Sequence, residues 1–397
     1  MKATAIQANK KSVTGVFSVG YDFWLLFSLG CLISLGIIMV ASSSFAIAEN
    51  SNGDAFYYLK RHIVFIGLGI FLSFIVLSMK MEWMQKLSKV LIIISLLLLI
   101  LVVVPGLGVK VGGARRWLNL GISRFQVVEA VKLAMIVYLA GYVVRHKVGL
   151  QHKFIGVVKP LMLSGLLAVL LLMQPDFGSA VLLLTITLFM VFIAGARFRD
   201  LLILAVFAAS MMAFLAYAEP YRIQRLISFQ NPWSDPFGGG FQLVQALIAI
   251  GSGKLTGIGV GGSVQKLFYL PEAHTDFVFS VFAEEMGFVG VIALIVIYLV
   301  LIFRIFSISK VALSLGKEFS AYACAGIAVW LSLQTFLSMG VNLGLLPTKG
   351  LTLPFISSGG SAIMMNILAI ALVMRVSYEN RVHFVKAIKK KSAEVSL

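Results

Sequence analysis

Long runs of apolar residues alternate with short polar segments along almost the whole chain. A helix needs about 20 apolar residues to cross a bilayer core of roughly 30 Å. Ten runs meet this requirement, at residues 21–48, 62–79, 88–105, 126–144, 156–173, 178–195, 201–218, 281–303, 320–340 and 358–376. The pattern predicts an all-α polytopic membrane protein with a single domain of ten transmembrane helices over residues 21–376.

The distribution of basic residues predicts how these helices are oriented. Ten spans place both termini on one side of the membrane, and cytoplasmic segments carry an excess of Lys and Arg. Most of the 33 Lys and Arg residues lie on the side of the termini, in segments 1–20, 80–89, 145–159, 197–199, 304–317 and 375–397. We therefore expect a cytoplasmic N-terminal tail at residues 1–20 and a basic cytoplasmic C-terminal tail at residues 377–397.

The outer loops differ in length, and the longest of them indicate function. Loops 106–125, 219–280 and 341–357 are long and carry most of the outer charge, and long loops without structure of their own are usually functional. Residues 242–250 form an apolar run too short to span, which predicts a short interfacial or re-entrant helix. The glycines that follow, Gly253, Gly257 and Gly259 among them, are expected to supply loop flexibility.

Composition agrees with this class and excludes others. Hydrophobic residues make up 60% of the chain and the mean hydropathy is +0.99, which a soluble domain would not tolerate on its surface. The net charge of +17 is dispersed between apolar runs, so it does not form the basic face that nucleic-acid binding requires. Cys31 and Cys324 lie inside apolar runs, where a free thiol acts as a small hydrophobe.

Residues 270–287 carry the most distinctive chemistry, because Glu272, Asp276, Glu284 and Glu285 gather where a loop enters a membrane helix. Ionisable groups in such a place are costly to desolvate and indicate a functional site. Asp276 is a candidate functional carboxylate, and the alternative, of about equal weight, is a cap of the helix that follows. Glu284 lies within about 80° of Asp276 on a helix, so we expect it to reach the same cavity.

His274 stands between two of these carboxylates. One histidine with hard oxygen ligands would favour a loosely held Mg²⁺ or Mn²⁺ ion over Zn²⁺. A divalent cation is therefore the only cofactor that the sequence suggests.

Two outer loops carry cations that suit phosphate groups. Lys110, Arg115 and Arg116 flank a pair of glycines, and they fit phosphate binding and contact with lipid headgroups equally well. Lys349 lies in a loop bounded by prolines and is a further candidate. Glu129 and Lys132 are three residues apart on one helix and close enough to pair, and such a buried pair is at least as often structural as catalytic.

Two short segments are expected to cap helices. Asp176 follows Gln174 and Pro175 and comes just before an apolar run, which is typical of a helix cap. The segment 357–361 reads Ser-Ser-Gly-Gly-Ser before the last span. Its N–H groups could hold an anion, but capping is the simpler interpretation.

These motifs resemble the SEDS family of bacterial cell-wall proteins (shape, elongation, division and sporulation). The resemblance rests on residues 270–277 (Leu-Pro-Glu-Ala-His-Thr-Asp-Phe), 116–118 (Arg-Trp-Leu), 174–176 (Gln-Pro-Asp) and 347–354 (Pro-Thr-Lys-Gly-Leu-Thr-Leu-Pro). It extends over all ten predicted spans. The last of these segments is more similar to the division member than to the elongation member, while Ser358 replaces the tyrosine expected there.

The resemblance implies a peptidoglycan glycosyltransferase that polymerises lipid II at the outer face of the inner membrane during septal wall synthesis. It also implies a class B penicillin-binding protein as partner, together with other division proteins. The family's catalytic aspartate corresponds to Asp276, which the resemblance therefore implies to be the general base. The candidates for binding the pyrophosphate or the sugar are Lys110, Arg115, Arg116, Lys349, Glu272, His274 and Glu284.

Two other functions fit the same spans, a lipid II transporter and a non-catalytic division scaffold. Ion-coupled carriers usually place acidic groups near the middle of spans, whereas here the acids lie at the outer ends, which favours surface chemistry. Function retained after Asp276→Asn would favour the scaffold.

Overall fold

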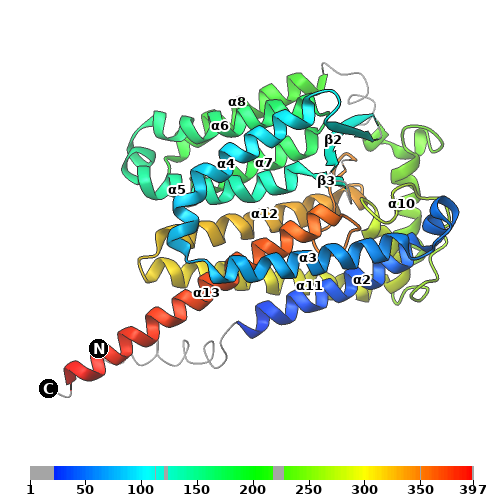
Figure 1. The fold of residues 1–397 in the computed structure, drawn as a ribbon. Coiled ribbons are helices and arrows are strands. Elements are labelled where there is room, and N and C mark those ends of the chain that lie inside the picture. The colour runs from blue at the N-terminus through cyan, green and yellow to red at the C-terminus, as the bar shows by residue number, and fades with distance from the viewer. Residues whose placement is uncertain (1–21, 112, 120–123, 218–227, 349, 396–397) are drawn as a thin grey trace.

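The computed structural model describes residues 22–111, 113–119, 124–217, 228–348 and 350–395, which form one bundle of long helices (Figure 1). Within these ranges, 8 helices are long and apolar enough to cross a membrane. They are α2 (Phe23–Asn52), α3 (Tyr57–Ser78), α4 (Met81–Val103), α5 (Val127–His152), α6 (Phe154–Met173), α11 (Val278–Ser314), α12 (Glu318–Asn342) and α13 (Gly360–Val395). Two more helices, α7 (Phe177–Ile193) and α8 (Phe198–Tyr217), lie at the sixth and seventh predicted spans.

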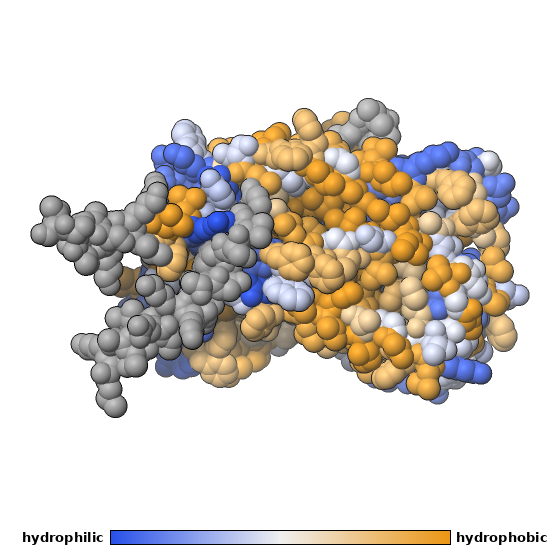
Figure 2. Space-filling view, turned by 90° about the horizontal axis from the view of Figure 1, so that it is seen from below, coloured by the Kyte–Doolittle hydropathy of each residue, from blue (hydrophilic) through white to orange (hydrophobic). Residues whose placement is uncertain are grey.

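The outer surface of the bundle agrees with a membrane setting. Figure 2 shows a broad apolar band across the middle of the molecule, with hydrophilic residues gathered toward the two ends. Isolated apolar residues on a surface are ordinary, but a continuous band marks a lipid-facing surface. The chain is a multi-pass membrane protein.

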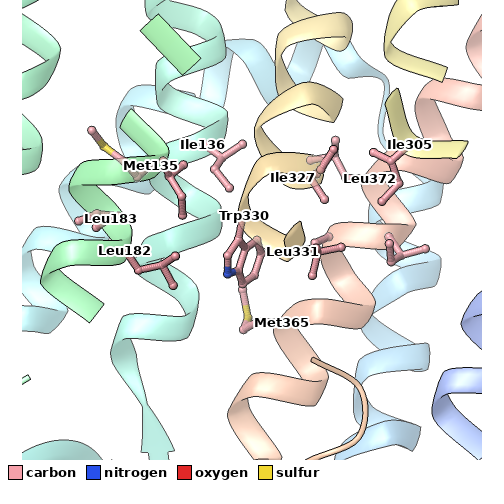
Figure 3. Packing of buried hydrophobic residues seen from close by; sticks show 14 of the residues in the cluster. Met135, Ile136, Leu182, Leu183, Ile305, Ile327, Trp330, Leu331, Met365 and Leu372 are labelled. Carbon is pink, nitrogen blue, oxygen red and sulfur yellow. The ribbon is translucent and has the colours of Figure 1, made fainter. Parts of the chain in front are cut away.

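The centre of the bundle is formed by α5 and α12, whose apolar windows are mostly buried. Trp330 on α12 lies between Ile136 of α5, Leu182 of α7 and Met365 of α13 in the close view of Figure 3. Both helices are less apolar than α11, whose window is mostly exposed, because polar side chains such as Lys132 and Gln334 find partners inside the bundle and not in lipid. The last helix, α13, continues without interruption to Val395, so the segment predicted as a C-terminal tail extends a membrane helix (Figure 1).

The all-α prediction was wrong for the loop between α4 and α5. A three-stranded antiparallel sheet forms there from β1 (Gly108–Val111), β2 (Ala114–Asn119) and β3 (Arg124–Gln126). Lys110 is opposite Arg115, and Leu118 is opposite Phe125. The valines and aromatic residues of this loop favour strands, and pairing satisfies backbone groups that would otherwise lie unbonded at the membrane surface.

The longest loop contains the short helix that the sequence predicts, α10 (Phe241–Ser252). Its buried residues Leu243, Val244, Ala246 and Ala249 form one face, and that face packs against α11. A 3-10 turn at η1 (Pro232–Ser234) precedes it.

Helix α11 is broken at Gly287, where φ is 65° and ψ is −169°. Residues 254–259 lie beside the break and bond to it. The N–H groups of Phe288 and Val289 donate to the carbonyls of Lys254 and Leu255 at 2.9 and 3.1 Å, and those of Ile258 and Gly259 donate to Glu284 and Glu285 at 3.1 Å. A broken membrane helix is tolerated where such partners satisfy its freed backbone groups.

Two glycines of this segment, Gly253 and Gly257, have a different role from the flexibility predicted for them. A Cβ atom on Gly253 would collide with the Ala283 carbonyl, and one on Gly257 would collide with the Glu285 carbonyl. Gly257 also has a φ of 77°, which L side chains rarely adopt. These glycines therefore allow two backbone segments to approach closely and rigidly.

Candidate functional site

A cavity of about 800 Å³ opens at the end of the bundle that carries the sheet and α10. Six parts of the chain meet around it: the start of α3, the sheet, the turn at Pro175, Gln242 of α10, residues 272–277 and the segment from Thr348 to Ser361. Its ionisable lining residues are Arg61, His62, Arg116, Arg124, Glu272, His274 and Asp276. Residues more than 200 positions apart in the sequence thus form one polar chamber.

Asp276 lies at the cavity, just before α11, and is half-buried. Asn342 of α12 holds this position from behind: its Nδ2 donates to the Asp276 carbonyl at 3.0 Å, and its Oδ1 accepts from the Ser280 N–H at 3.2 Å. Asn342 therefore caps the Ser280 N–H in the first turn of α11. Gly350 packs so closely here that an added Cβ would lie 3.0 Å from Asp276 Oδ2.

Glu272 and His274 line the cavity beside Asp276. Glu272 is exposed, and its Oε2 accepts from the Thr275 hydroxyl at 2.6 Å. The His274 ring is buried with its centroid 4.6 Å from that of Tyr58. Burial lowers the pKa of His274, and the nearby Glu272 carboxylate opposes this shift, so the imidazole is neutral near pH 7.

Arg116 is the only one of the four predicted phosphate-binding cations that the structure places in the cavity lining. Its Nε donates to the Gln174 carbonyl at 3.3 Å, and its terminal nitrogen donates to the Pro175 carbonyl. These bonds tie the sheet to the turn between α6 and α7. Asp176 caps α7 through a 3.2 Å bond from the Ser179 N–H, which confirms the predicted cap.

Two of the other three predicted cations lie outside the cavity lining. Lys110 and Arg115 are exposed and opposite each other across β1 and β2, outside the lining. Adjacent side chains in a strand point to opposite faces, so Arg116 and Arg115 separate although they are neighbours. Lys349 lies outside the described residues, while Thr348 and Gly350 on either side of it line the cavity.

Glu284 does not line the cavity, in contrast to the expectation from helical spacing. It is 2% exposed and accepts hydrogen bonds from the Ser263 hydroxyl and, at 3.1 Å, from the Val264 N–H. Residues 263–266 fold back onto α11 and enclose it. Glu285 is likewise buried, bonded to Lys266 Nζ at 2.8 Å and to the Ser42 hydroxyl at 2.6 Å.

Glu129 and Lys132 form the pair that their spacing predicts, deep between α5 and α12. Lys132 Nζ lies 2.8 Å from Glu129 Oε2 and donates to Gln334 Oε1 at 2.8 Å, 5.0 Å from the centre of the Trp330 ring. Gln334 Nε2 in turn donates to the carbonyl of Thr352 at 2.9 Å. Thr352 lines the cavity, so this buried pair supports one wall of the chamber from inside the bundle.

Sequence reasoning missed Arg61, His62 and Arg124 as lining residues. Arg61 and His62 come at the boundary where the second apolar run begins, so they resembled an ordinary polar flank. A usable signal was the pair of ionisable residues within two turns of the start of a span. Arg124 reaches the cavity only because β3 folds back along β2, which no local pattern indicated.

The lining combines three arginines with two carboxylates, which suits a reaction between a phosphate-bearing group and a group that loses a proton. Within the described part of the chain, no group of three or more His, Cys, Asp or Glu side chains is arranged to hold a metal ion. The carboxylates present do not form a metal cage on their own.

Known proteins of one family are similar to this chain over most of its length. The family model described as cell cycle protein, FTSW_RODA_SPOVE, matches residues 23–382. A probable peptidoglycan glycosyltransferase FtsW from Xanthomonas oryzae pv. oryzae is 48% identical over 359 residues, which cover 90% of this chain and 73% of that protein. A protein of the same name from Coxiella burnetii is 46% identical and covers 94% of this chain and 99% of its own length.

Solved structures agree with this relationship. A chain from work on the structural coordination of polymerization and crosslinking by a peptidoglycan synthase complex has a TM-score of 0.72 and 30% identity, covering 91% of this chain and 98% of its own. The rod shape determining protein RodA of Thermus thermophilus has a TM-score of 0.66 at 30% identity, covering 92% of this chain and 98% of its own. An aspartate-to-alanine variant of that RodA gives the same TM-score.

Proposed function

The chain belongs to the FtsW, RodA and SpoVE family of cell cycle proteins, and from this premise we propose that it is a peptidoglycan glycosyltransferase that polymerises lipid II during septal cell-wall synthesis. The observation that carries the proposal is the cavity itself, where the Asp276 carboxylate shares one chamber with Arg61, Arg116 and Arg124. Relatives at 43–48% identity carry the name of this activity.

In the proposed reaction Asp276 is the general base. Its carboxylate takes the proton from the acceptor sugar hydroxyl as that oxygen attacks the anomeric carbon of the donor sugar. The bond from this carbon to the lipid pyrophosphate breaks, and the pyrophosphate leaves with the electron pair. Arginines around the chamber stabilise the negative charge that develops on it.

The surroundings of Asp276 fit this role. Asn342 fixes its backbone through the Asp276 carbonyl, so the carboxylate points from a rigid helix start. His274 and Glu272 line the same cavity as Asp276. We propose them as substrate-contacting residues and Arg116 as a pyrophosphate ligand.

The proposal also includes the arrangement of the chain in the membrane. We place α7 and α8 as the sixth and seventh of ten spans, with both termini in the cytoplasm, and the cavity at the outer face of the inner membrane at the division septum. The basic residues of the inner segments support this orientation. On this basis residues 21–376 form the transmembrane domain between two cytoplasmic tails.

The proposed partners are lipid II, the nascent glycan strand, a class B penicillin-binding protein and other division proteins. A solved relative belongs to a complex that couples polymerization to crosslinking, which supports the transpeptidase partner. The FtsW names of relatives at 43–48% identity, against 30% for RodA, support division over elongation.

A divalent cation would be held chiefly by the substrate's pyrophosphate, because the described residues provide no cage for it and Mg²⁺ readily binds through one carboxylate plus phosphates. We derive no catalytic step through such an ion. Polymerisation that persists in excess EDTA would remove it from the proposal.

The transporter and scaffold alternatives are less well supported. Glu129 and Lys132 form an ionisable pair that is hydrogen-bonded within the core. The coupling site of an ion-driven transporter must bind and release an ion, which these bonds do not favour. A scaffold would have no use for the arrangement of arginines around Asp276.

The deciding experiment is polymerisation of lipid II in liposomes by the purified protein with its cognate transpeptidase. Wild type is compared with Asp276→Ala after both are shown to bind the partner. Glycan strands from the wild type alone support the proposal. Strands from both proteins would move the base to another residue, and strands from neither would make a flipping assay on the same liposomes decisive.

A further inference from the structure

The fold does not explain why the polar side chain of His62 is buried. It is 2% exposed, and neither Nδ1 nor Nε2 has a hydrogen-bond partner within the described part of the chain. A buried polar group without a hydrogen-bond partner destabilises the fold, so a residue of this kind indicates a partner that binds there. His62 lines the cavity, which gives a ligand access to it.

The position of His62 on α3 directs it toward the start of α13. The buried residues of α3 are His62, Phe65, Ile66, Gly69 and Ser73, which form one stripe by helical spacing. The two helices meet along this stripe, since Gly360 packs against the Phe65 ring and Gly69 lies against Met364 and Ile367. His62 is one turn above Phe65, so it faces the first residues of α13.

The start of α13 offers hydrogen-bond donors at the same place. Ser358 and Gly359 donate their N–H groups to the carbonyls of His274 and Ser357 at 2.9 and 2.8 Å, but the N–H groups of Gly360 and Ser361 have no acceptor among the described residues. Both residues line the cavity. The start of a long helix carries partial positive charge and binds anions readily.

We propose that His62 and the first turn of α13 form a phosphate subsite that holds the diphosphate of the lipid-linked substrate. The imidazole donates an N–H to one phosphoryl oxygen, and the backbone N–H groups of Gly360 and Ser361 donate to the same group. The inference rests on the proposed function and adds to it the residues that orient the leaving group.

The subsite is connected to the catalytic loop. The Ser358 N–H bonds to the His274 carbonyl at 2.9 Å, two residues before Asp276, and the His274 ring lies against Tyr58, one turn before His62 on α3. A diphosphate at α13 is thereby held at a fixed position relative to the Asp276 backbone. His62 is a positioning residue for the donor.

The test is equilibrium binding of radiolabelled farnesyl diphosphate to the full chain in detergent, with farnesol as a competitor that has the tail alone. His62→Phe and His62→Leu remove the donor with two different shapes, and His62→Gln keeps one. The matched control is Ser73→Ala, which removes a polar group from the same stripe, bonded only to its own helix at Gly69.

We expect both apolar variants to weaken diphosphate binding about 10- to 100-fold, the range for a hydrogen bond to a charged group. We expect His62→Gln to lie within a fewfold of wild type, and Ser73→Ala to match wild type. Farnesol should not displace the label. Wild-type affinity in whichever apolar variant folds, or displacement by farnesol, would overturn the subsite.

Polymerisation, measured on the same samples, separates this inference from the proposed function. Asp276→Asn should lose polymerisation and still bind farnesyl diphosphate through His62. If wild type binds the diphosphate in the expected way but makes no glycan, the proposed function fails and the subsite stands. If wild type makes glycan while the His62 variants bind like wild type, only the subsite fails.

Discussion

The two halves of segment 270–287 differ sharply although each carries two carboxylates. In the first half, Glu272 and Asp276 line an open cavity. In the second half, Glu284 and Glu285 are 2% and 1% exposed and bonded to Ser263, Val264, Lys266 and Ser42. Charge density in the sequence is the same on both sides, so the partners decide which acids are available to a substrate.

The difference arises from how each half is supported. Asn342 holds the Asp276 backbone from behind and leaves the side chain at the cavity. Around Glu284 and Glu285 the chain folds back, because the break at Gly287 lets residues 254–259 bond to α11. Substitutions in the first half are therefore expected to change activity, and substitutions in the second half are expected to change stability.

The largest effect is expected from Asp276→Asn. Loss of a general base lowers turnover about 10²- to 10⁴-fold, while the isosteric amide leaves the fold intact. The measurement is lipid II polymerisation alongside the thermal unfolding midpoint of the same preparation. A variant that keeps its activity, or that loses activity only because it unfolds, would contradict the assignment of the first half to activity.

The next effect is expected from Glu285→Gln, which leaves the Lys266 ammonium buried without a counter-charge. Breaking one side of a buried ion pair costs roughly 3–5 kcal/mol, seen as a lower unfolding midpoint in detergent with normal activity per folded molecule. The double variant Glu285→Gln/Lys266→Met removes both charges and should recover most of the loss. Equal destabilisation of single and double variants would show that the pair itself contributes little.

A smaller loss of stability is expected from Gly257→Ala. The positive φ alone costs about 1–3 kcal/mol for an alanine, and the added Cβ would press on the Glu285 carbonyl. Gly251→Ala is the matched control, since an added Cβ there has nothing within 4 Å and the residue lies in helix α10. Similar unfolding midpoints for the two variants would mean that the close approach beside Gly287 is not rigid.

The smallest effect is a pH dependence of stability due to His274. Burial lowers its pKa below the ordinary value of 6.5, so the unfolded chain binds this proton more tightly than the folded chain. The stabilising contribution is present above about pH 6.5 and is lost as the pH falls from there through the folded pKa. Unfolding midpoints measured from pH 7.5 to pH 5 should fall less in His274→Gln than in wild type, and parallel curves would contradict the assignment.

Hydropathy predicted the helices well because the bilayer imposes length and composition on every span. Each of the ten predicted runs coincides with a helix in the structure, and α10 formed where the short apolar run lies. The sheet at 108–126 was missed, since its strands are short and stand in a loop whose pairing depends on residues on both sides of a turn.

The candidate site was predicted in part. Asp276, Glu272, His274 and Arg116 were found by their chemistry, and all four line the cavity. Glu284 was misplaced because helical spacing says nothing about a loop that folds back to bond it. His62 was missed because its distinguishing feature is a buried ring without a hydrogen-bond partner. That feature exists only when α3 and α13 are packed together.

The break at Gly287 also links both sides of α11 to one loop. The carbonyls of Glu284 and Glu285 before the break and the N–H groups of Phe288 and Val289 after it all bond to residues 254–259, whereas the rest of the helix continues without interruption to Ser314. Amides that share bonds open and exchange with solvent as one cooperative unit. Hydrogen exchange should therefore report residues 284–289 together with the loop at residues 254–259, at a rate set apart from the rest of the same helix.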